Sequence, residues 1–391
     1  MSKLRFGLIG LGNMGGGHLA YFPSLSDATV TCVCDIDPAK VERHAAAHNA
    51  QGFTSAEELL KARVCDAVLI ATPHYDHPPI GISALQQGYH VLVEKPIAVG
   101  VKAARQLIEE SKKFPKQVFG IMYNQRSHPV YQKLRELIRD GELGEISRMT
   151  WIVTDWFRTW TYYASGGWRA TWAGEGGGVL INQCPHNLDL IQWITGLMPS
   201  RVTAVGFIGK THPIEVEDEM SAILEYPNGA IGHFITSTGE APGTNRLEIV
   251  GEFGKIIAEG GKLVFTRNRK SARDVNQKSP DSFASIENWR IEIPVGHAAP
   301  GGEHERITRN FIKAVQTGSA LLAPGEEGVR GLEIGNAMLM SAMTRKPVDL
   351  PINGDDFDQL IKDLNTQYGG KKTLVTKPVE VDLAASSSSF K

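Results

Sequence analysis

The stretch LRFGLIGLGNMG at residues 4–15 decides the fold, because it takes an apolar strand directly into a glycine-rich turn. The glycines follow a G-x-G-x-x-G pattern. The first permits a tight turn, the second lets the backbone approach a pyrophosphate, and the third packs a helix against a strand. The residues that follow read as a helix, and the free N–H groups at a helix N-terminus favour phosphate. The pattern predicts a dinucleotide-binding turn formed by Gly10, Gly12, Asn13, Met14 and Gly15.

The second strand supports this interpretation. Residues 29–34 (TVTCVC) are apolar and end at Asp35. A carboxylate at this position can accept hydrogen bonds from the adenine ribose, and it repels a 2′-phosphate. No arginine stands beside Asp35, so the sequence favours NAD over NADP. The alternative is a plain strand–helix–strand unit that binds no ligand.

Length and composition place further limits on the protein. The 391 residues allow two domains of ordinary size, and the net charge of −2 suggests neither nucleic-acid nor anionic-membrane binding. No apolar run has transmembrane length. The N-terminus enters its first strand almost at once, so a cleavable signal peptide would have to remove the glycine turn, and we expect none. The four cysteines have no C-x-x-C spacing and read as reduced core thiols, which favours a cytoplasmic location. The histidines do not group at metal-ligand spacing, so we expect no metal.

The first third of the chain alternates strands with helices, which predicts a doubly wound parallel sheet in a Rossmann domain spanning residues 1–125. A Ser-x-x-Glu capping box at residues 55–58 predicts the start of one helix. Ligands of such sheets bind beyond the carboxyl ends of the strands. Three segments follow strand ends directly: Thr72-Pro73-His74, Glu94-Lys95-Pro96 and Tyr123-Asn124.

The pattern changes after a helix at residues 129–140. Four β-rich segments and a fifth region at 246–267 predict a large, mostly antiparallel open sheet in an α+β domain spanning residues 126–370. An Asn-Gly turn at residues 228–229 predicts a hairpin. We expect a polar loop at 267–286, final helices at 303–316 and 326–344, and a C-terminal tail at 371–391. A broad sheet with one exposed face predicts a homodimer or homotetramer.

Lys95 is the first candidate for chemistry, because it follows the strand that would pass beneath a nicotinamide. Pro96 restricts the lysine backbone and so directs its side chain. A lysine beside a hydroxyl or carbonyl can hydrogen-bond it and stabilise developing negative charge. Glu94 either orients Lys95 or faces solvent. The alternative for Lys95 is an ordinary surface lysine.

A second group of candidates lies in GGGVLINQCPHNLD at residues 176–189. Pro185 suits the first turn of a helix, which places His186 and Asp189 on one face near its start. Histidine is the side chain best matched to proton transfer near neutral pH. Asp189 is a structural carboxylate in this interpretation. The alternative for His186 is a helix-start histidine satisfied by its neighbours.

An aromatic cluster precedes the glycine run, with five of the seven tryptophans inside residues 151–172. Aromatic faces can stack on sugar rings while arginines bind hydroxyls, and core or interface packing is the alternative for most of these tryptophans. We predict Trp168 and Arg169 as the wall of a substrate pocket. Arg158 and Tyr163 are weaker candidates.

Taken in order, these motifs resemble the Gfo/Idh/MocA oxidoreductase family over residues 4–350. The resemblance rests on the glycine turn, Ala71-Thr-Pro-His-Tyr-Asp-His77, Glu94-Lys-Pro96, Tyr123-Asn-Gln-Arg126, Gly141-Glu-Leu-Gly-Glu-Ile146 and the glycine run into His186. It implies that Lys95 and His186 are the catalytic pair. It also implies that the NAD site is bordered by Ala71, Thr72, Pro73, His77, Glu94, Lys95 and Asn124.

This chain departs from the family pattern at one position. The family often has an aspartate four residues before its histidine, and here Asn182 stands there. An amide can position a hydroxyl but cannot accept its proton, so Lys95 and His186 carry more of the acid–base role. The N-Q-x-P-H run is similar to a subgroup that includes sugar and anhydrosugar dehydrogenases.

We therefore expect an NAD-dependent dehydrogenase that oxidises a secondary hydroxyl of a cyclic polyol, sugar, anhydrosugar or glycoside. Two alternatives share the fold. One is a glycosidase that retains NAD and works by oxidation, elimination and reduction. The other is a non-catalytic sugar or nucleotide sensor, and the presence of both Lys95 and His186 argues against it.

Overall fold

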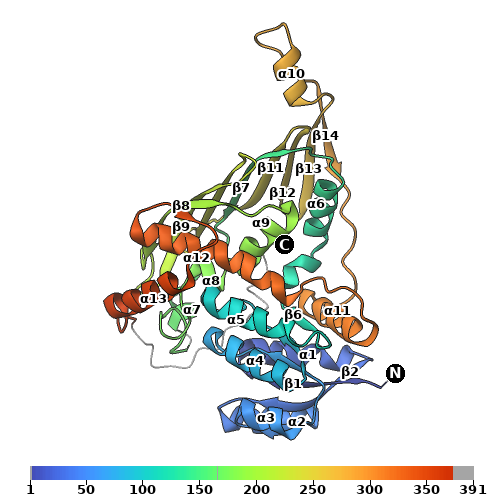
Figure 1. The fold of residues 1–391 in the computed structure, drawn as a ribbon, viewed down its shortest axis with the longest axis vertical. Helices are drawn as coiled ribbons and strands as arrows, with labels where there is room; N and C mark the ends of the chain where they lie inside the picture. The colour runs from blue at the N-terminus through green and yellow to red at the C-terminus, as the bar shows by residue number, and fades with distance from the viewer. Residues whose placement is uncertain (1, 165, 373–391) are drawn as a thin grey trace.

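The computed structural model describes residues 2–164 and 166–372, which form two sheets (Figure 1). A six-stranded sheet has the order β3-β2-β1-β4-β5-β6, and a nine-stranded sheet has the order β14-β13-β12-β11-β7-β10-β9-β8-β15. The predicted fold class, a doubly wound parallel sheet joined to a large open sheet, is confirmed.

Every pair of neighbouring strands in the first sheet is parallel. Its strands are β1 (Leu4–Ile9), β2 (Ala28–Cys34), β3 (Gln51–Phe53), β4 (Ala67–Ile70), β5 (His90–Val93) and β6 (Phe119–Ile121). The strand order reverses between β1 and β4, and ligands of doubly wound sheets bind at such a switch point. All four residues of β4 are buried, as expected for a parallel strand covered by helices on both faces.

Helices connect these strands: α1 (Asn13–Tyr21), α2 (Pro38–His48), α3 (Ala56–Ala62), α4 (His77–Gln86) and α5 (Val101–Lys112), with short 3₁₀ turns η1 (Phe22–Ser24), η2 (His74–Asp76) and η3 (Asn124–Ser127). Asp37 caps α2 by accepting a hydrogen bond from the Ala39 N–H. The capping box predicted for α3 is wrong in part. Ser55 is the N-cap residue, but its side chain makes no capping hydrogen bond.

The second sheet contains β7 (Ile146–Val153), β8 (Arg201–Ile208), β9 (Glu217–Glu225), β10 (Ile231–Ser237), β11 (Asn245–Gly251), β12 (Gly254–Glu259), β13 (Lys262–Asn268), β14 (Asn288–Ile293) and β15 (Val348–Asp349). Only the central pair β7 and β10 is parallel among the strands described here. The predicted hairpin joins β9 to β10, with Gly229 at a φ of 83°. Glycine adopts such a left-handed conformation without steric cost.

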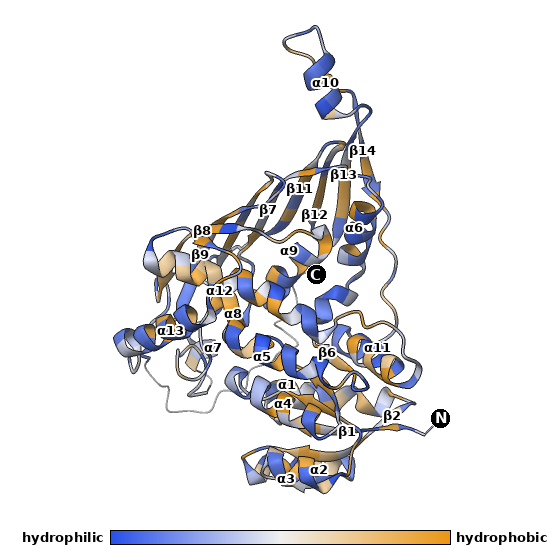
Figure 2. Ribbon diagram, viewed as in Figure 1, coloured by the Kyte–Doolittle hydropathy of each residue, from blue (hydrophilic) through white to orange (hydrophobic). Residues whose placement is uncertain are grey.

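Helices cover one face of this sheet (Figure 1). They include α6 (Pro129–Arg139), α8 (Val179–Asn182), α9 (Pro185–Thr195) and α12 (Gly328–Thr344), while α7 (Trp160–Ala164), α11 (Glu303–Thr317) and η4 (Gly325–Glu327) lie nearer the first sheet. The other face carries large, partly exposed apolar side chains, namely Val205, Phe207, Ile223 and Ile231. Apolar residues gather on the strands and on the inner helix faces, as Figure 2 shows.

Two C-terminal features differ from the sequence prediction. The segment predicted as a polar loop contains α10 (Ala272–Lys278), which projects from the far end of the large sheet (Figure 1). The last predicted helix is followed by another, α13 (Gly354–Tyr368), which the sequence analysis does not predict. Of the predicted tail, only residues 371 and 372 are described, and the rest lies outside the described residues.

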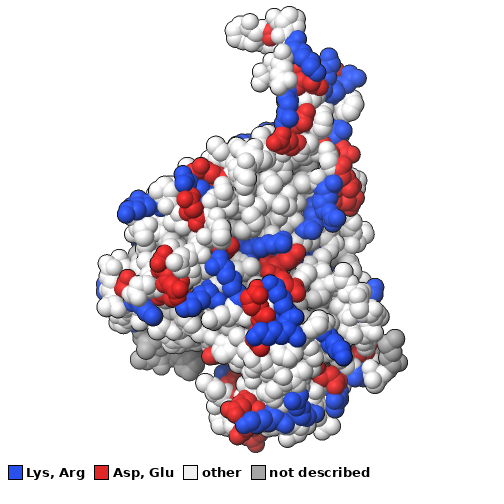
Figure 3. Space-filling view, viewed as in Figure 1, with Lys and Arg blue, Asp and Glu red and all other residues white. Residues whose placement is uncertain are grey.

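The cysteine prediction is confirmed, since all four cysteines are free and buried. On the face drawn in Figure 3, basic and acidic side chains are interspersed, and neither sign forms a continuous patch there. Among the described residues, no helix is both long and apolar enough to span a bilayer.

Candidate active site

The glycine turn joins the end of β1 to the start of α1, and its glycines have different surroundings. Gly10 has a φ of 94°, and a Cβ atom there would lie 2.5 Å from the Ala71 carbonyl oxygen. A Cβ atom on Gly15 would lie 1.9 Å from the Gly10 oxygen. A Cβ atom on Gly12 would meet no described atom within 4 Å. Gly10 and Gly15 are therefore required for packing, whereas Gly12 faces open space beside Asn13 and Met14, the first residues of α1.

Asp35 follows β2 and closes the same turn. Its carboxylate accepts hydrogen bonds from the Leu11 N–H at 2.7 Å and the Asp37 N–H at 2.9 Å. The Lys40 ammonium lies 3.8 Å from it. These contacts place the carboxylate at the edge of the glycine turn, where a dinucleotide ribose binds in such folds.

The segments after β4, β5 and β6 meet at the same sheet edge. His77 links two of them, because its ring nitrogens lie 2.7 Å from the Pro96 oxygen and 2.8 Å from the Thr72 oxygen. Pro73 precedes η2, and Ala71 packs on Gly10. Within the described chain, several buried polar atoms here have no hydrogen-bond partner, among them Thr72 Oγ1, Asn124 Oδ1 and His186 Nδ1. Buried polar groups normally have partners, so these atoms and the open space at Gly12 fit a bound dinucleotide.

A buried network fixes Glu94. One of its oxygens lies 2.7 Å from His18 Nε2, and the other accepts a hydrogen bond from the Lys95 N–H at 3.0 Å. The second ring nitrogen of His18 lies 2.6 Å from the Tyr21 hydroxyl, which contacts Thr308 on α11 at 2.8 Å. Burial alone would raise the pKa of Glu94, but the hydrogen bond and charge of His18 lower it to about 2. Glu94 is therefore ionised beside Lys95.

The Lys95 side chain reaches the glycine-run segment. Its Nζ atom donates a hydrogen bond to the backbone oxygen of Asn182 at 3.1 Å. Burial lowers the pKa of Lys95, and the charges of Glu94 and Glu175 oppose this shift. The structure thus brings together Lys95 and Asn182, two of the predicted catalytic residues.

His186, the third predicted catalytic residue, lies at the start of α9 and is 7% exposed. Its ring meets Tyr123 edge-on, with ring centroids 6.2 Å apart. Burial and then the Lys95 charge hold the pKa of His186 well below 6.5. The imidazole is therefore neutral near pH 7 and can accept a proton.

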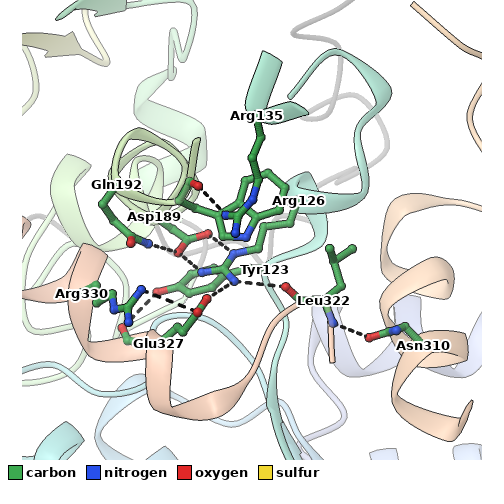
Figure 4. Close-up of polar contacts among 11 residues, drawn as sticks. Tyr123, Arg126, Arg135, Asp189, Gln192, Asn310, Leu322, Glu327 and Arg330 are labelled. Carbon is green, nitrogen blue, oxygen red and sulfur yellow. Dashed lines mark hydrogen bonds and ion pairs between the residues drawn. The ribbon is translucent and has the colours of Figure 1, made fainter. Parts of the chain in front are cut away.

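Helix α9 is held in place by an ion-pair cluster, as Figure 4 shows. The Arg126 guanidinium is fully buried and donates to both oxygens of Asp189, at 2.7 and 2.5 Å. It also pairs with Glu327 and donates to the Leu322 oxygen at 3.1 Å. The interpretation of Asp189 as a structural carboxylate agrees with this geometry, because its two oxygens face Arg126.

The four predicted substrate residues of the aromatic cluster have different surroundings. Trp168 is 36% exposed and meets His74 edge-on, and the Arg169 guanidinium lies 5.0 Å from the Trp168 ring centre. Arg158 lies 5.2 Å from the Trp156 ring centre. Tyr163 is buried, and its hydroxyl donates to Thr238 at 2.7 Å on the sheet side. Two other tryptophans of the cluster, Trp151 and Trp172, are fully buried, which fits the core-packing alternative.

Three residues near the site are not among the site residues predicted from the sequence. Tyr162 donates from its hydroxyl to Asn182 Oδ1 at 3.1 Å, and Glu175 accepts from the other end of the same amide. His304 lies in the first turn of α11, its ring centroid is 5.5 Å from that of His18 in an edge-on contact, and burial lowers its pKa to about 4. The sequence offered a weak signal for two of them, because Tyr162 adjoins Tyr163 and Glu175 adjoins the glycine run.

Comparison with known proteins adds family information to this geometry. Two family models match: "Oxidoreductase family, NAD-binding Rossmann fold" over residues 4–121 and "GFO/IDH/MocA C-terminal domain" over residues 131–257. An inositol 2-dehydrogenase of Corynebacterium glutamicum is 30% identical over 240 residues, which is 59% of this chain and 66% of that protein. A levoglucosan dehydrogenase of Pseudarthrobacter phenanthrenivorans is 25% identical and covers 90% of this chain and 99% of that protein.

A solved structure supports the fold and the cofactor. The WlbA dehydrogenase of Chromobacterium violaceum, crystallised with NADH and UDP-GlcNAcA, has a TM-score of 0.76 and 26% identity. The match covers 90% of this chain and 97% of that chain. The two family matches together extend over both sheets, and the N-terminal one is an NAD-binding fold. The chain therefore belongs to the Gfo/Idh/MocA family of oxidoreductases.

Proposed function

We propose that this protein is an NAD-dependent dehydrogenase that oxidises a secondary hydroxyl of a cyclic polyol, sugar, anhydrosugar or glycoside. One observation carries the proposal: partly buried Lys95 follows β5, and buried His186 packs on Tyr123 after β6, close enough for the Lys95 charge to lower the pKa of His186. Relatives named inositol 2-dehydrogenase and levoglucosan dehydrogenase support the substrate class.

The residues divide the chemistry among themselves. The nicotinamide ring supplies the hydride acceptor when the cofactor is bound. His186 takes the hydroxyl proton at a ring nitrogen of its neutral imidazole. Lys95 donates a hydrogen bond to the same oxygen and stabilises its developing negative charge. Asn182 holds the substrate beside Lys95, and Trp168 and Arg169 form a pocket wall.

Assembly and location complete this proposal. The apolar face formed by Val205, Phe207, Ile223 and Ile231 is suited to a second copy of the chain, so we propose a homodimer or homotetramer. Four free thiols fit a reducing compartment, so we propose a cytoplasmic protein.

The test follows the near-ultraviolet absorbance of NADH when the protein is mixed with NAD and a panel of inositols, aldoses, anhydrosugars and glycosides. An increase in NADH absorbance with one class of these compounds establishes dehydrogenase activity and identifies the class of substrate. Release of an aglycone without net NADH points instead to a glycosidase that retains its cofactor. NAD binding with neither signal points to a sensor.

A further inference from the structure

Glu175 is a buried carboxylate in the segment that leads into the glycine run, and it is 1% exposed. One oxygen accepts a hydrogen bond from the Ala170 N–H at 2.6 Å, and the other accepts from Asn182 Nδ2. The Arg169 guanidinium lies 3.7 Å away. Burial raises the pKa of Glu175, and the Arg169 charge and these donors oppose the shift. An ionised carboxylate is stable in such a place only when it is paired and hydrogen-bonded.

The carboxylate decides how the Asn182 amide is oriented. An ionised carboxylate has only acceptor atoms, so Asn182 must present its NH₂ group to Glu175. Its Oδ1 atom then points the other way and accepts from the Tyr162 hydroxyl at 3.1 Å. With a neutral partner in place of Glu175, the amide could adopt either orientation.

The donor and acceptor roles of the neighbouring side chains agree with this orientation of the amide. The Tyr162 oxygen accepts hydrogen bonds from Arg169 Nη1 at 2.7 Å and Gln183 Nε2 at 3.2 Å, so its own proton is available for Asn182. The donors therefore run from Arg169 through Tyr162 and Asn182 to the carboxylate. Arg169 also forms an ion pair with Glu175, so the first donor and the last acceptor of this hydrogen-bonded chain are in contact. In each of these hydrogen bonds, the donor and the acceptor are therefore fixed.

We propose that Glu175 is a positioning residue that acts through Asn182. It makes the Asn182 carboxamide oxygen an obligate acceptor, so that the site selects a substrate that presents a hydroxyl donor to it. The backbone oxygen of Asn182 already binds Lys95 Nζ, so one residue sets both contacts. The preferred substrate then has two neighbouring hydroxyls, one at Lys95 and His186 and one at Asn182. This inference rests on the proposed function.

An exchange of the two side chains tests the proposal. Glu175→Gln no longer fixes the orientation of the Asn182 amide, and Asn182→Asp places two carboxylates in contact. We expect each single variant to lower kcat/KM about tenfold or more, as loss of one hydrogen bond to a charged group does. The double variant restores an amide paired with a carboxylate, and we expect it to recover to within about threefold of wild type.

Two results would overturn the proposal. If Glu175 only supports the backbone at Ala170, the double variant combines the losses in kcat/KM of the two single variants and recovers no activity. If the carboxylate introduced by Asn182→Asp acts alone as a base, that single variant is as active as the double variant. Glu217→Gln is the matched control, because Glu217 is a buried carboxylate that binds the backbone at Gly178 and Leu180. Adding Asn182→Asp to that control should recover no activity.

Selectivity and stability give two further measurements. Wild type should prefer the substrate over its analogue without the neighbouring hydroxyl by about tenfold or more, and Glu175→Gln should narrow that ratio. Thermal unfolding at pH 7 measures the coupling between residues 175 and 182 without the need for a substrate. It compares the Tm of wild type, the two single variants and the double variant. If no panel substrate reacts but the exchange restores Tm, the proposed function fails while the pairing of Glu175 with Asn182 stands. If Tm shows no recovery, the pairing itself fails.

Discussion

At the scale of single residues, Lys95 is the side chain on which the proposed chemistry depends most. Its partly buried ammonium donates a hydrogen bond to the backbone oxygen of Asn182, on the glycine-run segment. We expect Lys95→Ala to lower kcat about a hundredfold or more, as removal of a donor to a developing oxyanion does. The Kd for NADH, measured by fluorescence, should change less than about threefold. Near-normal turnover would contradict the assigned role.

His186 predicts the pH dependence. Burial and the Lys95 charge lower its pKa below 6.5, so the base form persists at neutral pH and is lost only as the pH falls below that value. The pKa of Lys95 is also lowered, which places the loss of its proton below 10.5. We expect kcat/KM to form a plateau around neutral pH, with an acid limb below pH 6.5 and an alkaline limb that begins below pH 10.5.

His186→Asn is the control for this profile, because asparagine does not titrate. The variant should be slower at all pH values and should lack the acid limb. Retention of that limb would assign it to another group, of which His304 is a nearby candidate, with its pKa lowered to about 4.

At the scale of elements, the sequence predicted the repeated alternation of strands and helices and the turns at which strands end. Strand–helix alternation and glycine turns depend on local patterns, so β1, α1 and the first sheet could be read directly. Helix α13 has Phe357, Ile361 and Leu364 buried on one side, so its periodicity is present in the sequence although the helix was not predicted. By contrast, β14 is largely exposed, and an exposed edge strand leaves little hydrophobic pattern to read.

The site was predictable to a similar extent. Lys95 and His186 stand at a strand end and a helix start, positions that a sequence can reveal. Glu175 and Tyr162 contact Asn182 only when the loop before α8 and helix α7 pack around it, and contacts of that kind have no sequence period. Tyr163 illustrates the same limit, because its hydroxyl faces Thr238 whereas its neighbour Tyr162 faces Asn182.

Helix α9 yields a prediction about stability. Asp189→Asn leaves the buried Arg126 charge with only Glu327 as a carboxylate partner among the described residues, so we expect a loss of about 3 kcal/mol in the free energy of unfolding. Asp349→Asn is the matched control, since Asp349 also binds both donors of an arginine, Arg201, but at an exposed site. That control should cost much less than Asp189→Asn, because water screens an exposed pair. Urea unfolding compares the two, and equal losses would show that burial of the pair has no special effect.

At the scale of the whole molecule, the large sheet divides two tasks between its faces. One face packs against α8 and α12 and so supports the site, whereas the other carries Phe207, Ile223 and their neighbours, 44% and 45% exposed. Apolar side chains clustered on adjacent strands at this exposure are typical of a surface that another protein covers. Because the site-bearing face is already covered by helices, association through the open face leaves the site accessible in each copy.

This arrangement predicts how assembly and activity separate. Phe207→Glu together with Ile223→Glu places two charges on the open face, and we expect light scattering after size-exclusion chromatography to show a monomer where wild type is a dimer or tetramer. NADH binding should persist, because both residues lie on strands of the second sheet, outside the nucleotide-binding domain. Phe283→Glu, on the projecting segment after α10 and 93% exposed, is the control and should leave assembly unchanged. If the double variant keeps its assembly, or if Phe283→Glu alone disrupts it, the subunit contact lies elsewhere, and the projecting segment becomes the surface to test.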